Sequence, residues 1–67
     1  MPHAQITLVK GKTTEQKQRI AERVTDVLVE ETGAKRERVS LSIIEVEDDG
    51  FAERGVLIRE LRKRERR

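Results

Sequence analysis

The residue best suited to chemistry in this chain is Pro2, which directly follows the initiator Met1. A small second residue favours removal of the initiator by an aminopeptidase, and this would leave proline at the N-terminus. The nitrogen of an N-terminal proline is a secondary amine and therefore a titratable base. An α-amino group has a pKa far below that of a lysine amine, and burial lowers it further because desolvation disfavours the charged form. Pro2 is therefore a candidate general base.

The composition offers few other routes to catalysis. The 67 residues include no cysteine and one histidine, His3, so we expect no disulfide framework and no metal site. The side chain of His3 is expected on the strand face opposite to Pro2. No apolar run reaches transmembrane length and no signal peptide precedes the first expected strand, so we expect a cytoplasmic protein without a membrane partner.

The same composition is poor in material for a core. The chain is 34% hydrophobic and 42% charged, and Phe51 is its only aromatic residue. A domain of this size buries only about 60% of the surface of its unfolded chain. Without disulfides or metal, association between chains is the remaining source of stability. We therefore expect a homo-oligomer.

The first half of the chain has the pattern of a strand followed by a helix. Ala4, Ile6 and Leu8 alternate with polar residues, which indicates a strand that ends by Gly11. Thr13 and Gln16 have the spacing of a capping box. A helix is predicted from there to Gly33, a plausible C-cap. Its buried stripe is predicted to hold Ile20, Ala21, Val24, Val27 and Leu28, and its exposed face Lys17, Glu22, Asp26 and Glu30.

A second strand is predicted over residues 38–46, with Arg38 and Ser40 on one face. Two strands joined by one helix form a βαβ unit with parallel strands. A turn is expected at residues 47–50, and residues 56–58 fit either a strand or the start of a helix. The fold class is α+β, in a single domain of residues 1–67. The basic residues 59–67 are expected to be a solvated tail, and nucleic-acid binding is not favoured because no aromatic residue lies among them.

Taken together, these features resemble the 4-oxalocrotonate tautomerase family. The resemblance rests on Pro2 at the first strand, on Gly11-Lys12 leading into Glu15-Gln16-Lys17, and on Phe51 after an acidic turn. It implies a β-α-β protomer that pairs into a dimer with a four-stranded sheet, and three such dimers in a hexamer. It also implies a cofactor-independent isomerase in which the proline moves protons between enol and keto forms of a small 2-oxo or 2-hydroxydienoic acid.

The resemblance also implies which residues bind the carboxylate substrate. Pro2 and Phe51 match the family's base and apolar wall, and Lys12 stands where the first of two arginines is expected. Ser40 stands where the second arginine is expected, so Arg38 and Arg54 are candidates to replace it. The glycine-rich stretch after the phenylalanine is reduced to Ala52-Glu53-Arg54-Gly55. The dicarboxylate substrate typical of the family therefore remains open.

Two other functions compete with this interpretation. The first is a non-catalytic oligomeric binding protein that uses the basic tail. The second is a hydratase or dehalogenase, because some relatives in the superfamily pair the proline with a carboxylate that activates water, and Glu53 is close to Phe51 in the sequence.

Overall fold

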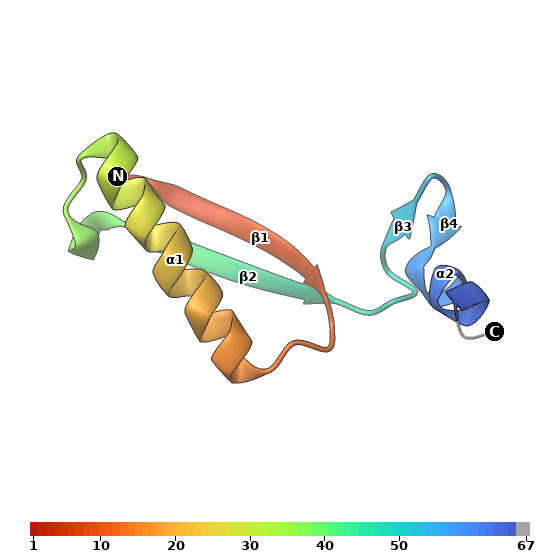
Figure 1. Cartoon of the computed structure of the whole chain (residues 1–67). Helices are drawn as coiled ribbons and strands as arrows, with labels where there is room; N and C mark the ends of the chain where they lie inside the picture. The colour runs from red at the N-terminus through yellow and green to blue at the C-terminus, as the bar shows by residue number, and fades with distance from the viewer. Residues whose placement is uncertain (66–67) are drawn as a thin grey trace.

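The computed structural model describes residues 1–65, which form one βαβ unit followed by a small hairpin and a second helix (Figure 1). The elements in chain order are β1 (His3–Val9), α1 (Thr14–Thr32), a 3₁₀ helix (Arg36–Arg38), β2 (Ser40–Val46), β3 (Ala52–Glu53), β4 (Val56–Leu57) and α2 (Ile58–Glu65). Neither α-helix within residues 1–65 is both long and apolar enough to cross a membrane.

Strands β1 and β2 pair in parallel, in a register that runs from His3 opposite Ser40 to Val9 opposite Val46. Helix α1 connects them and covers one face of this two-stranded sheet (Figure 1). The α+β class and the parallel βαβ unit predicted from the sequence are therefore confirmed. The opposite face of the sheet has no covering element within the described part of the chain, and Ile44 on this face is 41% exposed.

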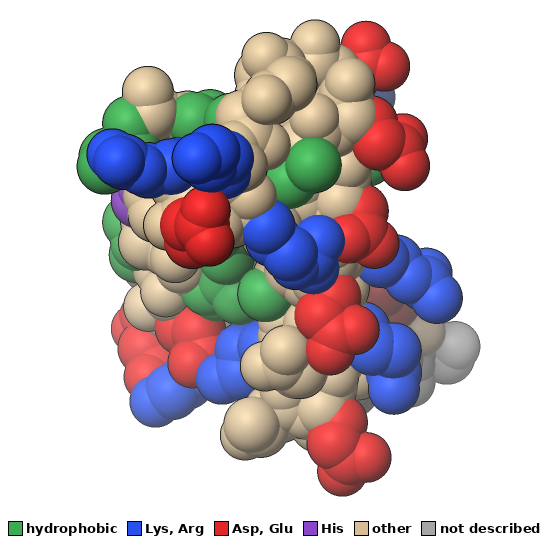
Figure 2. Space-filling model, turned by 90° about the vertical axis from the view of Figure 1, so that its left-hand side faces the viewer, with side chains coloured by type: hydrophobic (Ala, Val, Ile, Leu, Met, Phe, Trp, Pro, Cys, Tyr) green, Lys and Arg blue, Asp and Glu red, His purple; other side chains and the backbone are tan. Residues whose placement is uncertain are grey.

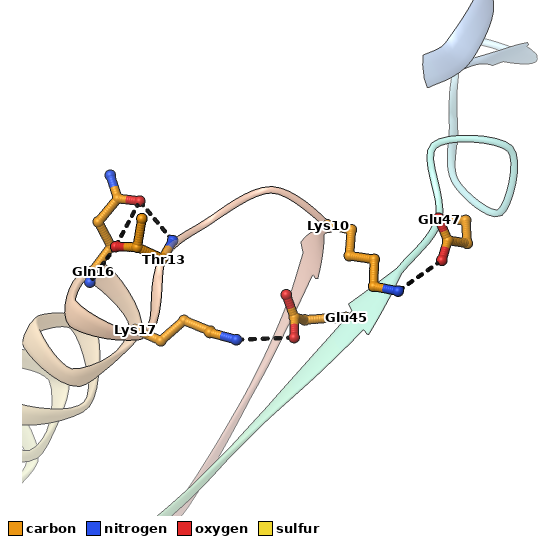
Figure 3. A network of polar contacts seen from close by, with 6 residues as sticks. All are labelled: Lys10, Thr13, Gln16, Lys17, Glu45 and Glu47. Carbon is orange, nitrogen blue, oxygen red and sulfur yellow. Dashed lines mark hydrogen bonds and ion pairs between the residues drawn. The ribbon is translucent and has the colours of Figure 1, made fainter.

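The ends of α1 are fixed by the residues that the sequence indicated. The hydroxyl of Thr13 accepts a hydrogen bond from the Gln16 N–H at 3.1 Å, and the Gln16 side chain accepts one from the Thr13 N–H at 2.9 Å (Figure 3). This reciprocal pair satisfies two N–H groups that have no partner within the helix. At the other end, Gly33 adopts a left-handed conformation with φ of 74°, and its N–H donates to the Val29 carbonyl. Glycine adopts this conformation without a steric penalty.

The start of the second strand differs from the prediction. Strand β2 begins at Ser40, and Arg38 belongs to the preceding 3₁₀ helix. In this turn the Arg38 N–H donates to the Lys35 carbonyl at 2.8 Å, and the Val39 N–H donates to the Arg36 carbonyl at 3.1 Å. These bonds coil the backbone at the point where a continued strand was expected. Arg38 consequently does not share a strand face with Ser40.

Two helical side chains also differ from the predicted pattern. Val27, expected in the buried stripe, is 55% exposed, because it lies at the border of the stripe and the sheet is only two strands wide. Lys17, expected on the exposed face, is half-buried and pairs with Glu45 at 3.0 Å (Figure 3). It is three and four residues before Ile20 and Ala21, so it lies in line with the apolar stripe. Glu45 of β2 provides the compensating charge.

The segment after β2 contains both of the structures that the sequence left open. The predicted turn closes with a hydrogen bond from the Gly50 N–H to the Glu47 carbonyl, and residues 56–57 form β4 while Ile58 begins α2. Residues 59–65, predicted to be a solvated tail, instead belong to helix α2. Arg59 in this helix donates a hydrogen bond to Asp48 at 2.8 Å. This hydrogen bond and the negative charge of Asp48 raise the pKa of Arg59. Residues 66 and 67 of that tail lie outside the described residues.

A single chain has no enclosed core. None of the described residues is buried. The radius of gyration is 15.3 Å, whereas a compact domain of this length has about 11 Å. The accessible surface is 5562 Å², compared with about 4,400 Å² for a compact monomer of this length. This excess of accessible surface is larger than the roughly 800 Å² that each partner buries in a standard protein interface. The isolated chain therefore leaves apolar side chains exposed to solvent.

The capping box provides a direct test of the helix start. Thr13→Ala should lower the free energy of unfolding by about 1 kcal/mol, because it removes the side-chain acceptor at the N-cap. The matched control is Thr14→Ala at the exposed first helical position, which should change the free energy by less than about 0.5 kcal/mol. Urea unfolding at one fixed protein concentration measures both. An equal loss in the two variants would contradict the assignment of the cap to Thr13.

Candidate active site

Pro2 lies just before β1, at the end of the sheet where both strands begin. Its carbonyl accepts a hydrogen bond from the Ser40 N–H at 3.1 Å, which joins the start of β1 to the start of β2. Proline is compatible with this position because a residue at a strand start does not need to donate to the ladder. The side chain of Pro2 is half-buried. The candidate base is therefore held at a defined place in the fold.

A cavity of about 220 Å³ opens beside this proline. It is lined by Met1, Pro2, Ala34, Lys35 and Arg38. Roughly 300–1,000 Å³ is usual for a pocket that encloses a drug-sized ligand, so this cavity suits a small molecule or one end of a larger one. Figure 2 views the end of the molecule where the chain begins, and basic side chains lie there beside hydrophobic atoms. Met1 is 92% exposed at this cavity, so its removal would widen the entrance.

Of the sequence candidates, only Arg38 joins Pro2 at this cavity, and Lys35 joins them without having been predicted. The one sequence signal for Lys35 is Gly33, which ends α1 two residues earlier. A chain that leaves the helix there must return toward the start of β2, beside the start of β1. The sequence did not reveal this placement because it depends on the 3₁₀ turn at residues 36–38.

Ser40 is placed on the other face of the sheet. Its hydroxyl lies 2.7 Å from Nδ1 of His3, and the hydroxyl of Ser42 lies 3.2 Å from Nε2 of the same ring. Side chains alternate between faces along a strand, so the ring of His3 and these two hydroxyls lie on the open face, away from α1. Within one chain the Ser40 side chain therefore points away from the cavity of Pro2, although its backbone touches Pro2.

Lys12 and Phe51 lie at the opposite end of the sheet from Pro2. Lys12 lies in the loop after β1, which ends at Val9, and Phe51 follows the turn after β2. Figure 1 shows that both connections leave the sheet at the end opposite to the N-terminus. A strand of seven residues rises about 3.3 Å per residue, so its two ends are roughly 20 Å apart. A small dienoic acid is much shorter than this. One chain therefore cannot bring Pro2, Lys12 and Phe51 to the same substrate.

Glu53 and Arg54 belong to the hairpin. They line a cavity of about 320 Å³ together with Val56, Leu61 and Arg64. Arg54 has a φ of 53° in the turn between β3 and β4. This cavity is larger than the one beside Pro2 but does not contain the candidate base. Within one chain, Arg54 and Glu53 are thus grouped with Phe51 and separated from Pro2 and Arg38.

Most carboxylates near these groups are already paired. Asp48 contacts Arg59 and Arg62, and Glu47 accepts a hydrogen bond from Lys10 at 3.0 Å (Figure 3). That bond raises the pKa of Lys10. No group of three His, Asp or Glu side chains within residues 1–65 is arranged to hold a metal ion. The arrangement around Pro2 places the candidate base beside two cations that can bind an anion.

Comparison with known proteins gives the family of the chain. Residues 2–63 match the family model described as tautomerase enzyme. The chain is 41% identical over 61 residues to a 2-hydroxymuconate tautomerase of Pseudomonas putida, covering 91% of this chain and 97% of the relative. Among solved structures, a 4-oxalocrotonate tautomerase isozyme of Methylibium petroleiphilum superposes with a TM-score of 0.88 at 38% identity, covering 90% and 97% of the two chains. A heterohexameric 4-oxalocrotonate tautomerase of Chloroflexus aurantiacus has the same TM-score at 28% identity, covering 91% and 98%.

The fold, the position of Pro2 and these matches define the class of the protein as an isomerase of the tautomerase type. More narrowly, the chain belongs to the 4-oxalocrotonate tautomerase family, as the sequence predicted. The match to the family model begins at residue 2, which is the candidate base.

Proposed function

We propose that this protein is a cofactor-independent tautomerase that interconverts the enol and keto forms of a small 2-oxo or 2-hydroxydienoic acid, with the amine of Pro2 as the base. The observation that carries the proposal is the cavity in which Pro2 lies beside two cationic side chains. The names of the relatives support the substrate class, because the similar protein of Pseudomonas putida is a 2-hydroxymuconate tautomerase.

The proposed reaction is a transfer of one proton between two atoms of the substrate. After loss of Met1, neutral Pro2 removes a proton from the enol hydroxyl, or from a carbon next to the carbonyl group, and becomes an ammonium. The ammonium then returns the proton to another carbon, so no other reactant is consumed. Cations near the substrate bind its carboxylate and hold the reacting atoms beside the base.

We propose that each site is assembled from more than one chain. Pro2 and Arg38 of one chain form the part around the base, and a neighbouring chain supplies Lys12 and Phe51, which lie roughly 20 Å away within one chain, and with them Arg54. Phe51 is 41% exposed in the single chain and would form an apolar wall that keeps the proline amine neutral. Ser40 would act by positioning Pro2 through its backbone N–H. The relative of Chloroflexus aurantiacus is a heterohexamer, which supports an oligomer of this chain.

The proline base has a direct test. Protein shown by mass spectrometry to lack Met1 should convert 2-hydroxymuconate and the enol of phenylpyruvate to their keto forms. Pro2→Ala, likewise without Met1, should reduce kcat by about 10²- to 10⁴-fold, because it replaces the positioned base. Activity in Pro2→Ala equal to that of the wild type would refute the proposed mechanism.

The shared site can be tested by mixing two defective variants. Pro2→Ala lacks the base and Lys12→Gln lacks a carboxylate ligand, so each alone should be slow at low substrate concentration. In oligomers formed from an equal mixture, about a quarter of the sites should regain both residues, because each site draws them from two different chains. The rate of the mixture is compared with the average of the rates of the two variants measured separately. A mixture that shows only that average would place both residues in one chain.

Association itself should be visible in solution. Because the single chain has no buried residue, we expect light scattering to give a mass several times that of one chain. The midpoint of thermal unfolding should rise with protein concentration, since mass action favours the assembled form. A monomer whose midpoint is independent of concentration would contradict the proposed assembly.

The competing hydratase or dehalogenase has its own signature. Glu53 lies in the hairpin cavity, so it reaches a proline only if that proline belongs to a neighbouring chain. In such an enzyme Glu53→Gln would abolish hydration and leave tautomerisation intact.

The competing binding protein depends on residues 59–67, and two of its basic residues, Arg59 and Arg62, already face Asp48. The tautomerase is therefore the function that the geometry supports best.

A further inference from the structure

We infer that Lys35 and Arg38, from the same chain as Pro2, form the anion-binding wall of the proline cavity and hold the carboxylate of the substrate. The inference rests on the proposed tautomerase function. It assigns to the turn after α1 the role that the resemblance gives to an arginine at position 40. It also defines the ligand as a small acid whose carboxylate binds beside the base.

The local backbone places these two side chains together. Lys35 is the N-cap of the 3₁₀ helix and Arg38 is its last residue, and the Arg38 N–H donates to the Lys35 carbonyl at 2.8 Å. Lys35, with an extended backbone, and Arg38 at the end of the turn therefore lie at the same bend of the chain, and both line the cavity with Pro2.

The charges of this turn are used in two different ways. Arg36 donates to Asp26 of α1 at 2.6 Å, and both side chains of this pair are 55% exposed. Lys35 and Arg38 have no carboxylate within ion-pair distance among the described residues, and Glu37 between them does not line the cavity. Arg36 is thus already paired within the chain. The other two cations are free to bind an external anion.

The chemistry of the two side chains suits a carboxylate. A guanidinium donates two parallel hydrogen bonds to a carboxylate, and an ammonium adds a compact point charge. Two cations that share a cavity without a counter-ion repel each other, and a bound carboxylate removes this repulsion. Ser40, at the position where the family arginine is expected, contributes no charge, and its hydroxyl is engaged with His3.

The test compares two substrates that differ only in charge, the enol of phenylpyruvate and the enol of its methyl ester. In the double variant Lys35→Gln/Arg38→Gln, KM for the acid should rise about 10- to 100-fold, the range expected for losing charge-assisted hydrogen bonds. The kcat for the acid and both constants for the ester should stay within about twofold, because the lost contact is made equally in the ground state and the transition state. Arg36→Gln is the matched control and should leave both substrates unaffected.

Three results would overturn the inference. The first is a KM for the acid that does not change in the double variant. The second is a KM that rises equally for the acid and the ester. The third is a rise in KM for the acid in Arg36→Gln as large as that in the double variant. The charge-preserving variant Lys35→Arg/Arg38→Lys should retain binding of the acid, which separates a role of charge from a fault in folding.

A second measurement is independent of turnover. Calorimetry of 3-phenylpropionate, an acid that cannot tautomerise, should show binding to the wild type and to Pro2→Ala, and loss of binding in the double variant. If Pro2→Ala keeps full activity while the double variant loses this binding, the proposed function fails and the anion site stands. If Pro2→Ala is inactive and the double variant binds as the wild type does, the function stands and the inference fails.

Discussion

One helix on a two-stranded sheet cannot enclose an apolar core, and the rest of the structure depends on this constraint. Helix α1 covers one face of β1 and β2, while Ile44 on the other face and Val27 at the border of the helix stay exposed. The hairpin and α2 extend away from the sheet, which gives the chain its longest dimension of 47 Å. Each chain therefore presents apolar surface on several sides, and the association that we propose would provide the burial that a domain of this size needs.

The same geometry decides where chemistry can occur. In a parallel pair both strands begin at the same end of the sheet, so Pro2 before β1 lies next to the turn that leads into β2. Strand β1 then separates this end from Lys12, and β2 separates it from Phe51. A site that needs all three residues must be completed across a border between chains. In the proposed assembly, stability and catalysis would depend on the same contacts between chains.

The turn between α1 and β2 shows how a short segment divides its charges between structure and ligand. Gly33 ends the helix in a left-handed conformation, and the following 3₁₀ helix brings Lys35 and Arg38 to the cavity while Arg36 returns to Asp26. An exposed pair such as Arg36 with Asp26 contributes only about 0–1 kcal/mol to stability.

The sequence by itself determined the elements whose signals are local. Alternating apolar residues defined β1, the pair of Thr13 and Gln16 defined the start of α1, and Gly33 defined its end, because hydrogen bonds between near neighbours decide these features. The place of Pro2 and the family followed from the same local patterns. Tertiary structure alone decided that Lys35 and Arg38 lie at the proline cavity and that Lys17 is half-buried against Glu45. These features depend on where the chain returns after α1, which is set by packing between distant segments and not by the pattern of any one of them.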